Sequence, residues 1–228
     1  MTEFRIGSPA RKILVYGVGQ LAELAYYYLS NDSPHEVCGF VVDPEFSHAR
    51  EFCGLPVIAP DLAIRDHSPR DVAMFVAISY TSMNHERRIK CDWARDNGYE
   101  LISYVSTRAT TFENLRIGDN CFILESNTIQ PFVTVGNNVF MWSGNHIGHH
   151  SVIEDDVFIT SHCVVSGNCT VGRGSFLGVN CTIQNGIRVS EKSFVGPRTL
   201  VRTDTNAETV LVEEATKPLK TNSRALNL

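Results

Sequence analysis

An aliphatic residue recurs at every sixth position between residues 117 and 201, without an insertion or a gap. The series consists of Ile117, Ile123, Ile129, Val135, Met141, Ile147, Ile153, Ile159, Val165, Val171, Leu177, Ile183, Val189, Val195 and Val201. A period of six fits neither an amphipathic helix nor an alternating strand, because those repeat after about 3.6 and about two residues. The pattern therefore predicts a larger structural unit that repeats along the chain.

Two further columns of the repeat describe this unit. Three positions after the aliphatic residue, many hexads have a residue that tolerates left-handed backbone angles, namely Asn120, Asn138, Gly144, Asp156, Asn168, Gly174, Asn180, Gly186 and Asp204. Two positions before it, small side chains suit a narrow interior, as at Cys121, Ser151, Cys163, Cys169, Ser175 and Cys181. Short strands joined by tight corners predict a parallel β-helix of five triangular coils, each made of three hexads and spaced by about 4.8 Å.

The hexads resemble those of the hexapeptide-repeat acyltransferases. The resemblance is carried by Arg116-Ile117-Gly118, Thr134-Val135-Gly136, His146-Ile147-Gly148, Thr170-Val171-Gly172 and Phe176-Leu177-Gly178. It implies a left-handed β-helix, against the usual right-handed crossover rule. More narrowly, the chain from Arg11 to Lys217 resembles the bacterial PglD/NeuD-like enzymes, which acetylate nucleotide-linked amino sugars or sialic acid. The finish of the repeat region, from Glu213 to Lys217, departs from the Gly-x-Pro-Ala-Lys end that is common in this family.

Composition limits the classes of function. The chain has 228 residues, 43% of them apolar, which is enough for one large domain or two small ones. A formal net charge of −5 offers no surface for a polyanion, so we expect no nucleic acid partner. No apolar leader follows Met1, and no run approaches the roughly 18 apolar residues of a membrane span. We therefore expect a cytoplasmic protein with no membrane partner.

The seven cysteines form no C-x-x-C pair. Cys121, Cys163, Cys169 and Cys181 share one column of the repeat, and Cys163 and Cys181 are one full coil apart. We expect these side chains to pack inside the β-helix rather than to bind zinc or form disulfides.

The first part of the chain alternates strands and helices. We expect buried strands at 12–17, 37–42, 72–78 and 101–105, a helix beginning near Leu21, and a helix over 84–97, with a connecting stretch around Pro56 and Pro60. This order predicts a small parallel sheet and hence a Rossmann-like α/β domain at residues 1–106. An all-β left-handed β-helix domain follows at 107–228, linked through residues 107–114.

A Gly17-x-Gly19-x-x-Ala22 turn lies between the first expected strand and helix, and Asp43 ends the second strand. Such glycines let phosphate approach the backbone N–H groups at a helix N-terminus. In the resembling family this domain binds the nucleotide of the substrate, which implies contacts from Gly17, Gly19, Gln20 and Asp43. The alternatives are a simple tight turn, or a dinucleotide site that would need a second half-domain of similar size. Arg87 is either a phosphate or carboxylate partner or a solvated helix charge.

Histidines cluster at 146–150, with a further one at His162. Histidine is the side chain whose proton affinity suits general base catalysis near neutral pH. His149 matches the family's catalytic histidine through Ile147-Gly-His-His-Ser-Val-Ile153. The family commonly has Asp or Glu at the next position, where this sequence has His150. A partner carboxylate would then come from elsewhere, such as Glu125 or Asp155.

Other residues near His149 have possible supporting roles. They are His146, His150 and Trp142, whose indole would stack on a sugar ring or block one orientation of it. A metal site made by His146, His149, His150 and His162 is a competing interpretation. Because adjacent residues of a strand point to opposite faces, His149 and His150 would chelate together only at a distorted corner. We expect no metal.

The resemblance implies acetyl-CoA as the acyl donor, held in a groove between subunits near Gly167 and Gly178, and therefore a homotrimer. Ordinary repeat glycines are the alternative at both positions. The implied reaction is direct transfer of acetyl to the amino group of a nucleotide-linked amino sugar in bacterial surface polysaccharide or glycan biosynthesis. The alternatives are O-acetylation of a sugar or sialic acid, and a non-catalytic trimeric scaffold that binds nucleotide sugars.

Overall fold

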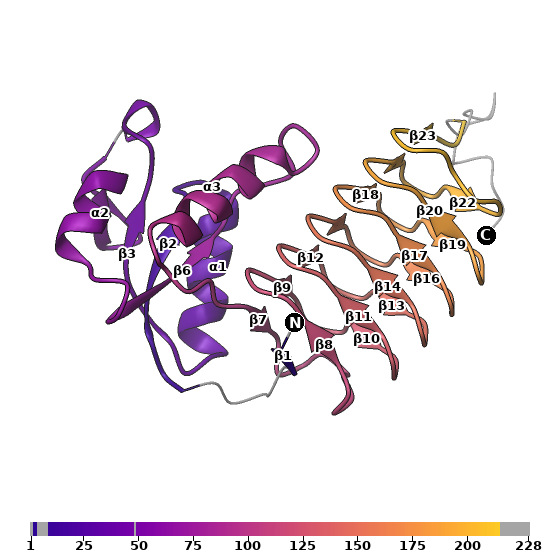
Figure 1. The fold of residues 1–228 in the computed structure, drawn as a ribbon, viewed down its shortest axis with the longest axis horizontal. Coiled ribbons are helices and arrows are strands. Elements are labelled where there is room, and N and C mark those ends of the chain that lie inside the picture. Colours follow the sequence, from indigo (N-terminus) through magenta and orange to yellow (C-terminus); the bar gives the residue numbers. More distant parts are fainter. Residues whose placement is uncertain (1, 4–8, 48, 215–228) are drawn as a thin grey trace, which may run out of the picture.

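The computed structural model describes residues 2–3, 9–47 and 49–214, which form an α/β lobe and a long β-helix lying side by side (Figure 1). The lobe is the part of the chain from β2 to α3. Its sheet has the strand order β4-β5-β3-β2-β6, with bounds Glu51–Phe52 for β4, Leu55–Ile58 for β5, Glu36–Val41 for β3, Lys12–Tyr16 for β2 and Val72–Val76 for β6. Neighbouring strands are parallel, except that β4 is antiparallel to β5.

Helices cover both faces of this sheet. They are α1 (Gln20–Asn31), α2 (Pro60–Asp66) and α3 (His85–Asp96), with a short 3₁₀ helix η1 at Pro44–Phe46. One face, with Ile13 and Phe75, packs against α1, and the other, with Leu14 and Met74, packs against α2 and α3. Alternate residues of a strand point to opposite faces, so each buried strand supplies two cores.

The lobe differs from the sequence-based expectation in two places. The stretch around Pro56 and Pro60 is not a simple connection, because it contains β4, β5 and α2. Pro60 is the first residue of α2, a position where its missing N–H costs nothing. The strand expected at 101–105 is divided, since Leu101 bridges to Met74 in the lobe while β7 (Tyr104–Val105) pairs with the β-helix.

The β-helix consists of two-residue strands that pair with their equivalents 18 positions along the chain, as Ile117 does with Val135. They form three parallel sheets. The first contains β8 (Arg116–Ile117), β11 (Thr134–Val135), β14 (Val152–Ile153), β17 (Thr170–Val171) and β20 (Arg188–Val189), with β1 (Thr2–Glu3) added antiparallel to β8. The second contains β9 (Phe122–Ile123), β12 (Phe140–Met141), β15 (Phe158–Ile159), β18 (Phe176–Leu177) and β21 (Phe194–Val195), between β7 and β23 (Val210–Leu211). The third contains β10 (Thr128–Ile129), β13 (His146–Ile147), β16 (Val164–Val165), β19 (Thr182–Ile183) and β22 (Leu200–Val201).

The interior is the one that the hexad pattern predicts. Every aliphatic residue of the series from Ile117 to Val201 has at most 3% of its surface exposed. The four cysteines of the repeat column are buried among them, each with at most 1% exposed. Five coils of three strands result, and this stacking of parallel strands fits a left-handed β-helix.

Left-handed residues turn the corners and define three edges. The first edge, between the β8–β20 and β9–β21 sheets, runs through Asn120, Asn138, Asp156, Gly174 and Lys192. The second edge, between the β9–β21 and β10–β22 sheets, runs through Ser126, Gly144, His162, Asn180 and Arg198. The third edge, between the β10–β22 and β8–β20 sheets, runs through Phe132, His150, Asn168 and Gly186.

Asp204 was expected at a further corner of the third edge, and this prediction is wrong. Its φ is not positive, and the chain does not build another strand in the β8–β20 sheet. Instead Val195 pairs with Leu211, so the last coil is shorter than the others. The decay of the hexad pattern after Val201 therefore marks the end of regular coiling.

The lobe packs on the face of the β-helix that lies opposite the third edge. One phenylalanine of each coil in the β9–β21 sheet points outward, and the centroids of neighbouring rings lie 5.1 to 6.1 Å apart, from Phe122 through Phe140, Phe158 and Phe176 to Phe194. Phe75 of β6 stacks on Phe140 at 5.9 Å, and Tyr80 contacts Phe158 and Phe176. The two parts therefore share one continuous apolar core.

A polar contact along the first edge complements this aromatic one. The side-chain amide of Asn120 pairs with the backbone of Val76 in both directions, at 2.7 and 3.1 Å. Arg87 of α3 is fully buried, donates to the Oδ1 and backbone oxygen of Asn138, and lies 4.1 Å from the centre of the Phe140 ring. Burial lowers the pKa of Arg87 to about 10, so it remains a cation at neutral pH.

Arg87→Ala is expected to lower the free energy of unfolding by about 3 kcal/mol or more, because it leaves a cavity and unpaired acceptors between lobe and β-helix. Urea unfolding would measure this. Arg88→Ala is the matched control, since the Arg88 side chain is 39% exposed and should contribute less than about 1 kcal/mol. Equal losses in the two variants would contradict the importance of the buried guanidinium.

Candidate active site

His149 follows strand β13 and lies on the third edge, where it is exposed. Its backbone N–H donates to Oε1 of Gln130 at 2.9 Å. Its ring lies over Gly167 of the next coil, where a Cβ would be 2.7 Å from Cε1 and 2.8 Å from Nε2. The absence of a side chain at Gly167 is therefore what lets the imidazole lie against the edge of the prism.

His150 contacts His149 directly. The two Nδ1 atoms are 3.1 Å apart, and the ring planes are nearly perpendicular. Side chains of adjacent residues were expected to diverge, but His150 has φ 58°, and this left-handed corner breaks the alternation of a strand. The ring of His150 also lies 4.7 Å from that of Phe132, one coil earlier.

The other residues expected near His149 are spread along the same face of the prism. His146 points outward from β13 and is half-buried between Thr128 and Val164. Trp142 precedes the second edge, at the opposite end of β13, and packs against the core shared with the lobe. The structure thus places His146 between Trp142 and His149 and does not gather all three at one point.

The four histidines considered as metal ligands, His146, His149, His150 and His162, do not form a metal cluster among the described residues. His162 lies on the second edge, where its ring covers Gly144, away from the third edge that carries His149. Across residues 2–3, 9–47 and 49–214, no group of three or more His, Cys, Asp or Glu side chains is arranged to hold a metal ion.

Neither carboxylate considered as a partner for His149 lies near it. Glu125 precedes the second edge and accepts hydrogen bonds from Tyr28 Oη at 2.8 Å and Ser143 Oγ at 2.6 Å. Asp155 precedes the first edge and pairs with Arg173 at 3.2 Å. Both acids have structural partners, and in the described part of the chain the side-chain atom within hydrogen-bond distance of the His149 ring is Nδ1 of His150.

The two glycines expected near coenzyme A lie on different edges. Gly167 is on the third edge beneath His149. Gly178 follows β18, next to the second edge, where a Cβ would lie 2.6 Å from the backbone nitrogen of Pro197 in the next coil. Lys217, at the end of the stretch that departs from the family pattern, lies outside the described residues.

The residues expected to contact a nucleotide meet at one end of the lobe's sheet. Gly17 has φ 127°, donates its N–H to Val41, and has no room for a Cβ, which would lie 2.8 Å from the oxygen of Ala77. Gly19 caps α1 and Gln20 begins it, both exposed.

Asp43 lies at the end of the neighbouring strand and has two partners of its own. It accepts a hydrogen bond from Tyr16 Oη at 2.7 Å and pairs with Lys90 Nζ at 2.8 Å. Burial, and then the bond to Asp43, raise the pKa of Tyr16 well above its ordinary value. Tyr16 therefore stays a neutral hydrogen-bond donor to the Asp43 carboxylate.

Arg87 has neither of the roles considered from the sequence. It is not a solvated charge and not an exposed partner for phosphate, because its guanidinium is enclosed between α3 and the β-helix. Its partner Asn138 is 51 positions away in the sequence, and only the fold brings the two side chains together, so the sequence alone could not reveal this contact.

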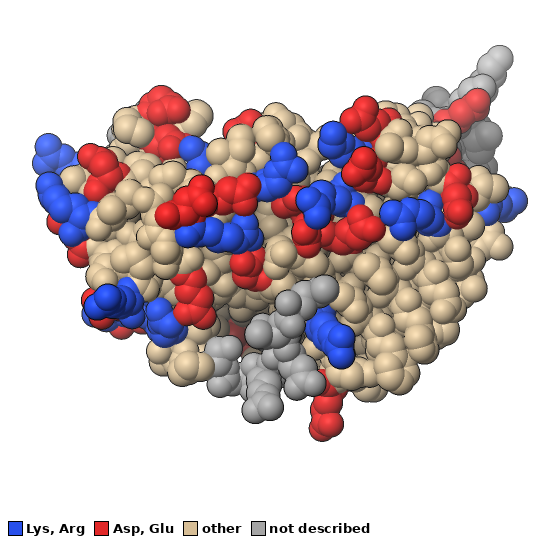
Figure 2. Space-filling model, viewed as in Figure 1, with Lys and Arg blue, Asp and Glu red and all other residues tan. Residues whose placement is uncertain are grey.

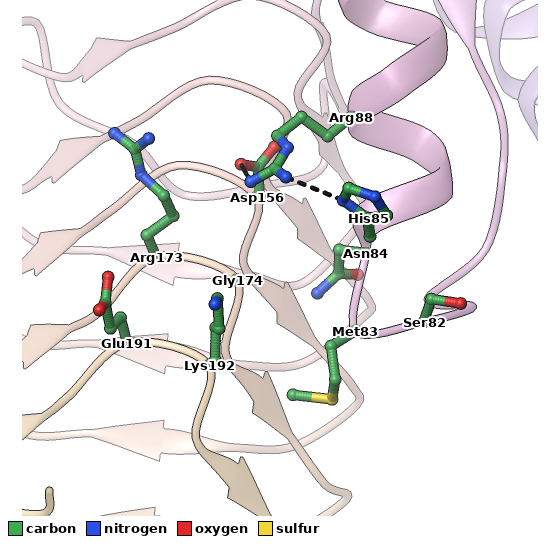
Figure 3. A pocket seen from close by; sticks show the side chains of 10 residues that line it. All are labelled: Ser82, Met83, Asn84, His85, Arg88, Asp156, Arg173, Gly174, Glu191 and Lys192. Atoms are coloured by element: carbon green, nitrogen blue, oxygen red, sulfur yellow. Dashed lines mark hydrogen bonds and ion pairs between the residues drawn. The ribbon is translucent and has the colours of Figure 1, made fainter. Parts of the chain in front are cut away.

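A cavity of about 330 Å³ lies between the start of α3 and the first edge of the β-helix (Figure 3). Its walls are the loop at 82–85 with Arg88, and the corners of three successive coils. Asn84 is fully buried in its wall, and neither its Oδ1 nor its Nδ2 has a hydrogen-bond partner in the described part of the chain. The residues expected to bind a nucleotide do not line this cavity.

Charge is unevenly distributed over the surface. Figure 2 shows Lys, Arg, Asp and Glu in a band that crosses the lobe and follows the β-helix, with few charged side chains over the coils below it. Exposed apolar residues surround the third edge instead, with exposed fractions of 61% for Phe132 and 38% each for Val152 and Val164. No helix in the described segments is long and apolar enough to span a membrane.

Comparison with known proteins finds similar solved structures but no match to a family model or to a curated sequence. The acetyltransferase domain of PglB from Neisseria gonorrhoeae, in complex with acetyl coenzyme A, has 21% identity and a TM-score of 0.80 over 92% of this chain and 100% of that chain. PerB from Caulobacter crescentus, in complex with CoA and GDP-perosamine, has 20% identity and a TM-score of 0.75 over 87% of this chain and 92% of that chain. The resemblance to sugar acetyltransferases is therefore confirmed at the level of the fold.

Gly167→Ala is expected to displace the His149 ring, because the new methyl group would overlap Cε1 and Nε2. The backbone of Gly167 is not left-handed, so alanine itself should be tolerated. In a double-mutant cycle, Gly167→Ala should cost stability in the wild type but little in a His149→Ala background, with a coupling of about 0.5–1 kcal/mol. Identical costs in both backgrounds would show that the ring does not rest on Gly167.

Proposed function

We propose that the chain is a cytoplasmic acyltransferase that moves an acetyl group from acetyl-CoA to the amino group of a nucleotide-linked amino sugar, with His149 as general base. The observation that carries this proposal is the exposed imidazole of His149, held over Gly167 on an edge of a β-helix. The fold is shared with an acetyltransferase domain that binds acetyl coenzyme A and with a protein that binds CoA and GDP-perosamine. No metal is part of the proposed reaction.

The proposed mechanism is direct transfer. The acceptor nitrogen attacks the thioester carbonyl of acetyl-CoA and forms the new C–N bond, while its proton passes to Nε2 of His149. The tetrahedral intermediate then collapses, the C–S bond breaks, and coenzyme A leaves as a thiolate that takes the proton from His149 and restores the base. A covalent acyl-enzyme on Cys163 is disfavoured, because this thiol is fully buried inside the prism.

In this proposal the chain divides into a Rossmann-like nucleotide-sugar-binding domain at residues 1–106 and an acyltransferase domain at 107–228. Gly17, Gly19 and Gln20 would contact the phosphates, since they lie at the carboxyl ends of parallel strands beside the N-terminus of α1. Asp43 would contact the nucleoside. Its bonds to Tyr16 and Lys90 hold the carboxylate at this edge of the sheet.

A homotrimer would complete the site. The lobe packs on the face opposite the third edge, so His149 and the lobe of one chain lie on opposite sides of the prism. Apolar side chains exposed on both sides of the third edge, such as Val152 and Val164, favour a contact with a second copy. Acetyl-CoA in that groove would contact Gly167 of one subunit and Gly178 of the next, and Trp142 and His146 would line the acceptor side.

Replacement of His149 by alanine tests the chemistry. Release of coenzyme A should be measured over a panel of nucleotide-linked amino and non-amino sugars. We expect turnover with an amino sugar and a loss of about 10²- to 10⁴-fold in kcat for His149→Ala. His162→Ala, which removes an exposed histidine from the second edge, is the matched control.

The panel also separates the alternatives. Turnover limited to neutral sugars would replace the N-acetyl reaction by O-acetylation. Intact oligomers that bind nucleotide sugars without turning over any of them would support the scaffold.

Mixed oligomers test the shared site. Gly19→Trp adds an indole at the start of α1, where the structure has nothing within 4 Å of a Cβ, and should block nucleotide binding without unfolding the lobe. Gly19→Trp and His149→Ala should each be inactive alone, and their coexpressed mixture should regain activity. Mixed oligomers confirmed by differential tags but lacking activity would place the site within one chain.

A further inference from the structure

We propose that His150 is a positioning residue that fixes the tautomer of His149, in the place where a carboxylate would otherwise act, an inference that rests on the proposed role of His149. The two Nδ1 atoms are 3.1 Å apart, within hydrogen-bond distance. A hydrogen bond between two imidazole nitrogens needs one N–H and one lone pair. The contact therefore carries one proton. Nε2 of the donor ring then has the lone pair, and Nε2 of the acceptor ring carries the other proton.

The surroundings of the two rings indicate which one donates the hydrogen bond and which one accepts it. Nε2 of His149 lies over Gly167 and has no hydrogen-bond partner in the described part of the chain. The ring of His150 is held by Phe132 at 4.7 Å and by its left-handed backbone. When His149 donates its Nδ1–H to Nδ1 of His150, Nε2 of His149 keeps the lone pair that accepts the proton in the proposed reaction.

No other described group competes for this role. The carboxylates of Glu125 and Asp155 are bonded to other partners near other edges. Gln130 approaches His149 but accepts a hydrogen bond from its backbone N–H, not from its ring. A neutral imidazole then orients His149 without adding the negative charge of an aspartate or glutamate.

The consequence for catalysis is specific. Loss of the hydrogen-bond partner of a metal-ligating histidine typically changes activity by about 10- to 100-fold, and we expect an effect of the same order for His149. His150 should therefore affect kcat through the orientation of His149 and leave KM for acetyl-CoA nearly unchanged. A residue that only stabilised the corner would change the amount of folded protein and would leave kcat, measured per folded protein, unchanged.

The tautomer can be observed directly by NMR of protein labelled with ¹⁵N-histidine. In the wild type near neutral pH, we expect His149 to carry its proton on Nδ1 and a lone pair on Nε2. His150→Phe keeps an aromatic ring and removes the acceptor, and Phe132 shows that phenylalanine fits a corner of this edge. In that variant the proton of His149 should move to Nε2, with kcat lowered about 10- to 100-fold.

Two further variants keep the test independent of folding. His150→Asn restores an acceptor oxygen in a residue that tolerates left-handed angles, and should return the Nδ1–H tautomer and much of the activity. His162→Phe makes the same exchange at a corner of the second edge and should change neither signal nor rate.

Wild-type His149 protonated on Nε2, or an unchanged tautomer in His150→Phe, would overturn the inference. The expected tautomers in a protein that transfers no acetyl group would leave the pairing intact and overturn the proposed function instead. The two failures are thus distinguishable.

Discussion

The structure depends on a coil of constant length. Backbone N–H groups of one coil bond to carbonyl groups of the next, as Gly118 does with Val135 at 3.0 Å and Gly148 with Val165 at 2.7 Å. Because strands of only two residues cannot shift their register locally, an inserted residue would misalign every position that follows it. A constant coil therefore places equal columns of side chains directly above one another. The interior column forms the core, and the outward columns form extended surfaces whose chemistry the sequence can vary independently.

Two of these outward columns hold the lobe. The phenylalanine ladder from Phe122 to Phe194 supplies apolar area. Because the hydrophobic effect is non-directional, burial of this area does not by itself fix the lobe at one position along the prism. The polar contacts at the first edge supply position, because Asn120 matches the backbone of Val76 and Arg87 matches Asn138. A sliding displacement of the lobe would leave these buried groups unpaired, at a cost larger than that of the lost contacts themselves. The edge of the lobe's sheet with Gly17 and Asp43 therefore has a fixed place relative to the coils, which the proposed site between subunits would require.

Much of this could be predicted where the information is local. The hexad period defined the β-helix, its buried column and most of its corners, because these depend on residues a few positions apart. Arg87 was missed because its burial depends on contact with Asn138, 51 positions away. The phenylalanine ladder had a visible signal, one residue in every 18, although only the packed lobe explains why it is apolar. At the candidate site, the resemblance to the acyltransferase family pointed to His149. Its support by Gly167 and His150 needed the stacking of coils and the angle of the corner.

The corner position explains why His150 can differ from the expected acid without disturbing the fold. Position 150 must adopt φ near 58°, and among residues other than glycine this region favours Asn, Asp and His. An exchange between these types changes the chemistry of the side chain while the backbone strain stays similar. The neighbouring ring of Phe132 then favours an aromatic partner over a carboxylate, since it offers a face to stack on and no hydrogen-bond donor. The constraint that shapes the coil thus also selects which groups can stand beside His149.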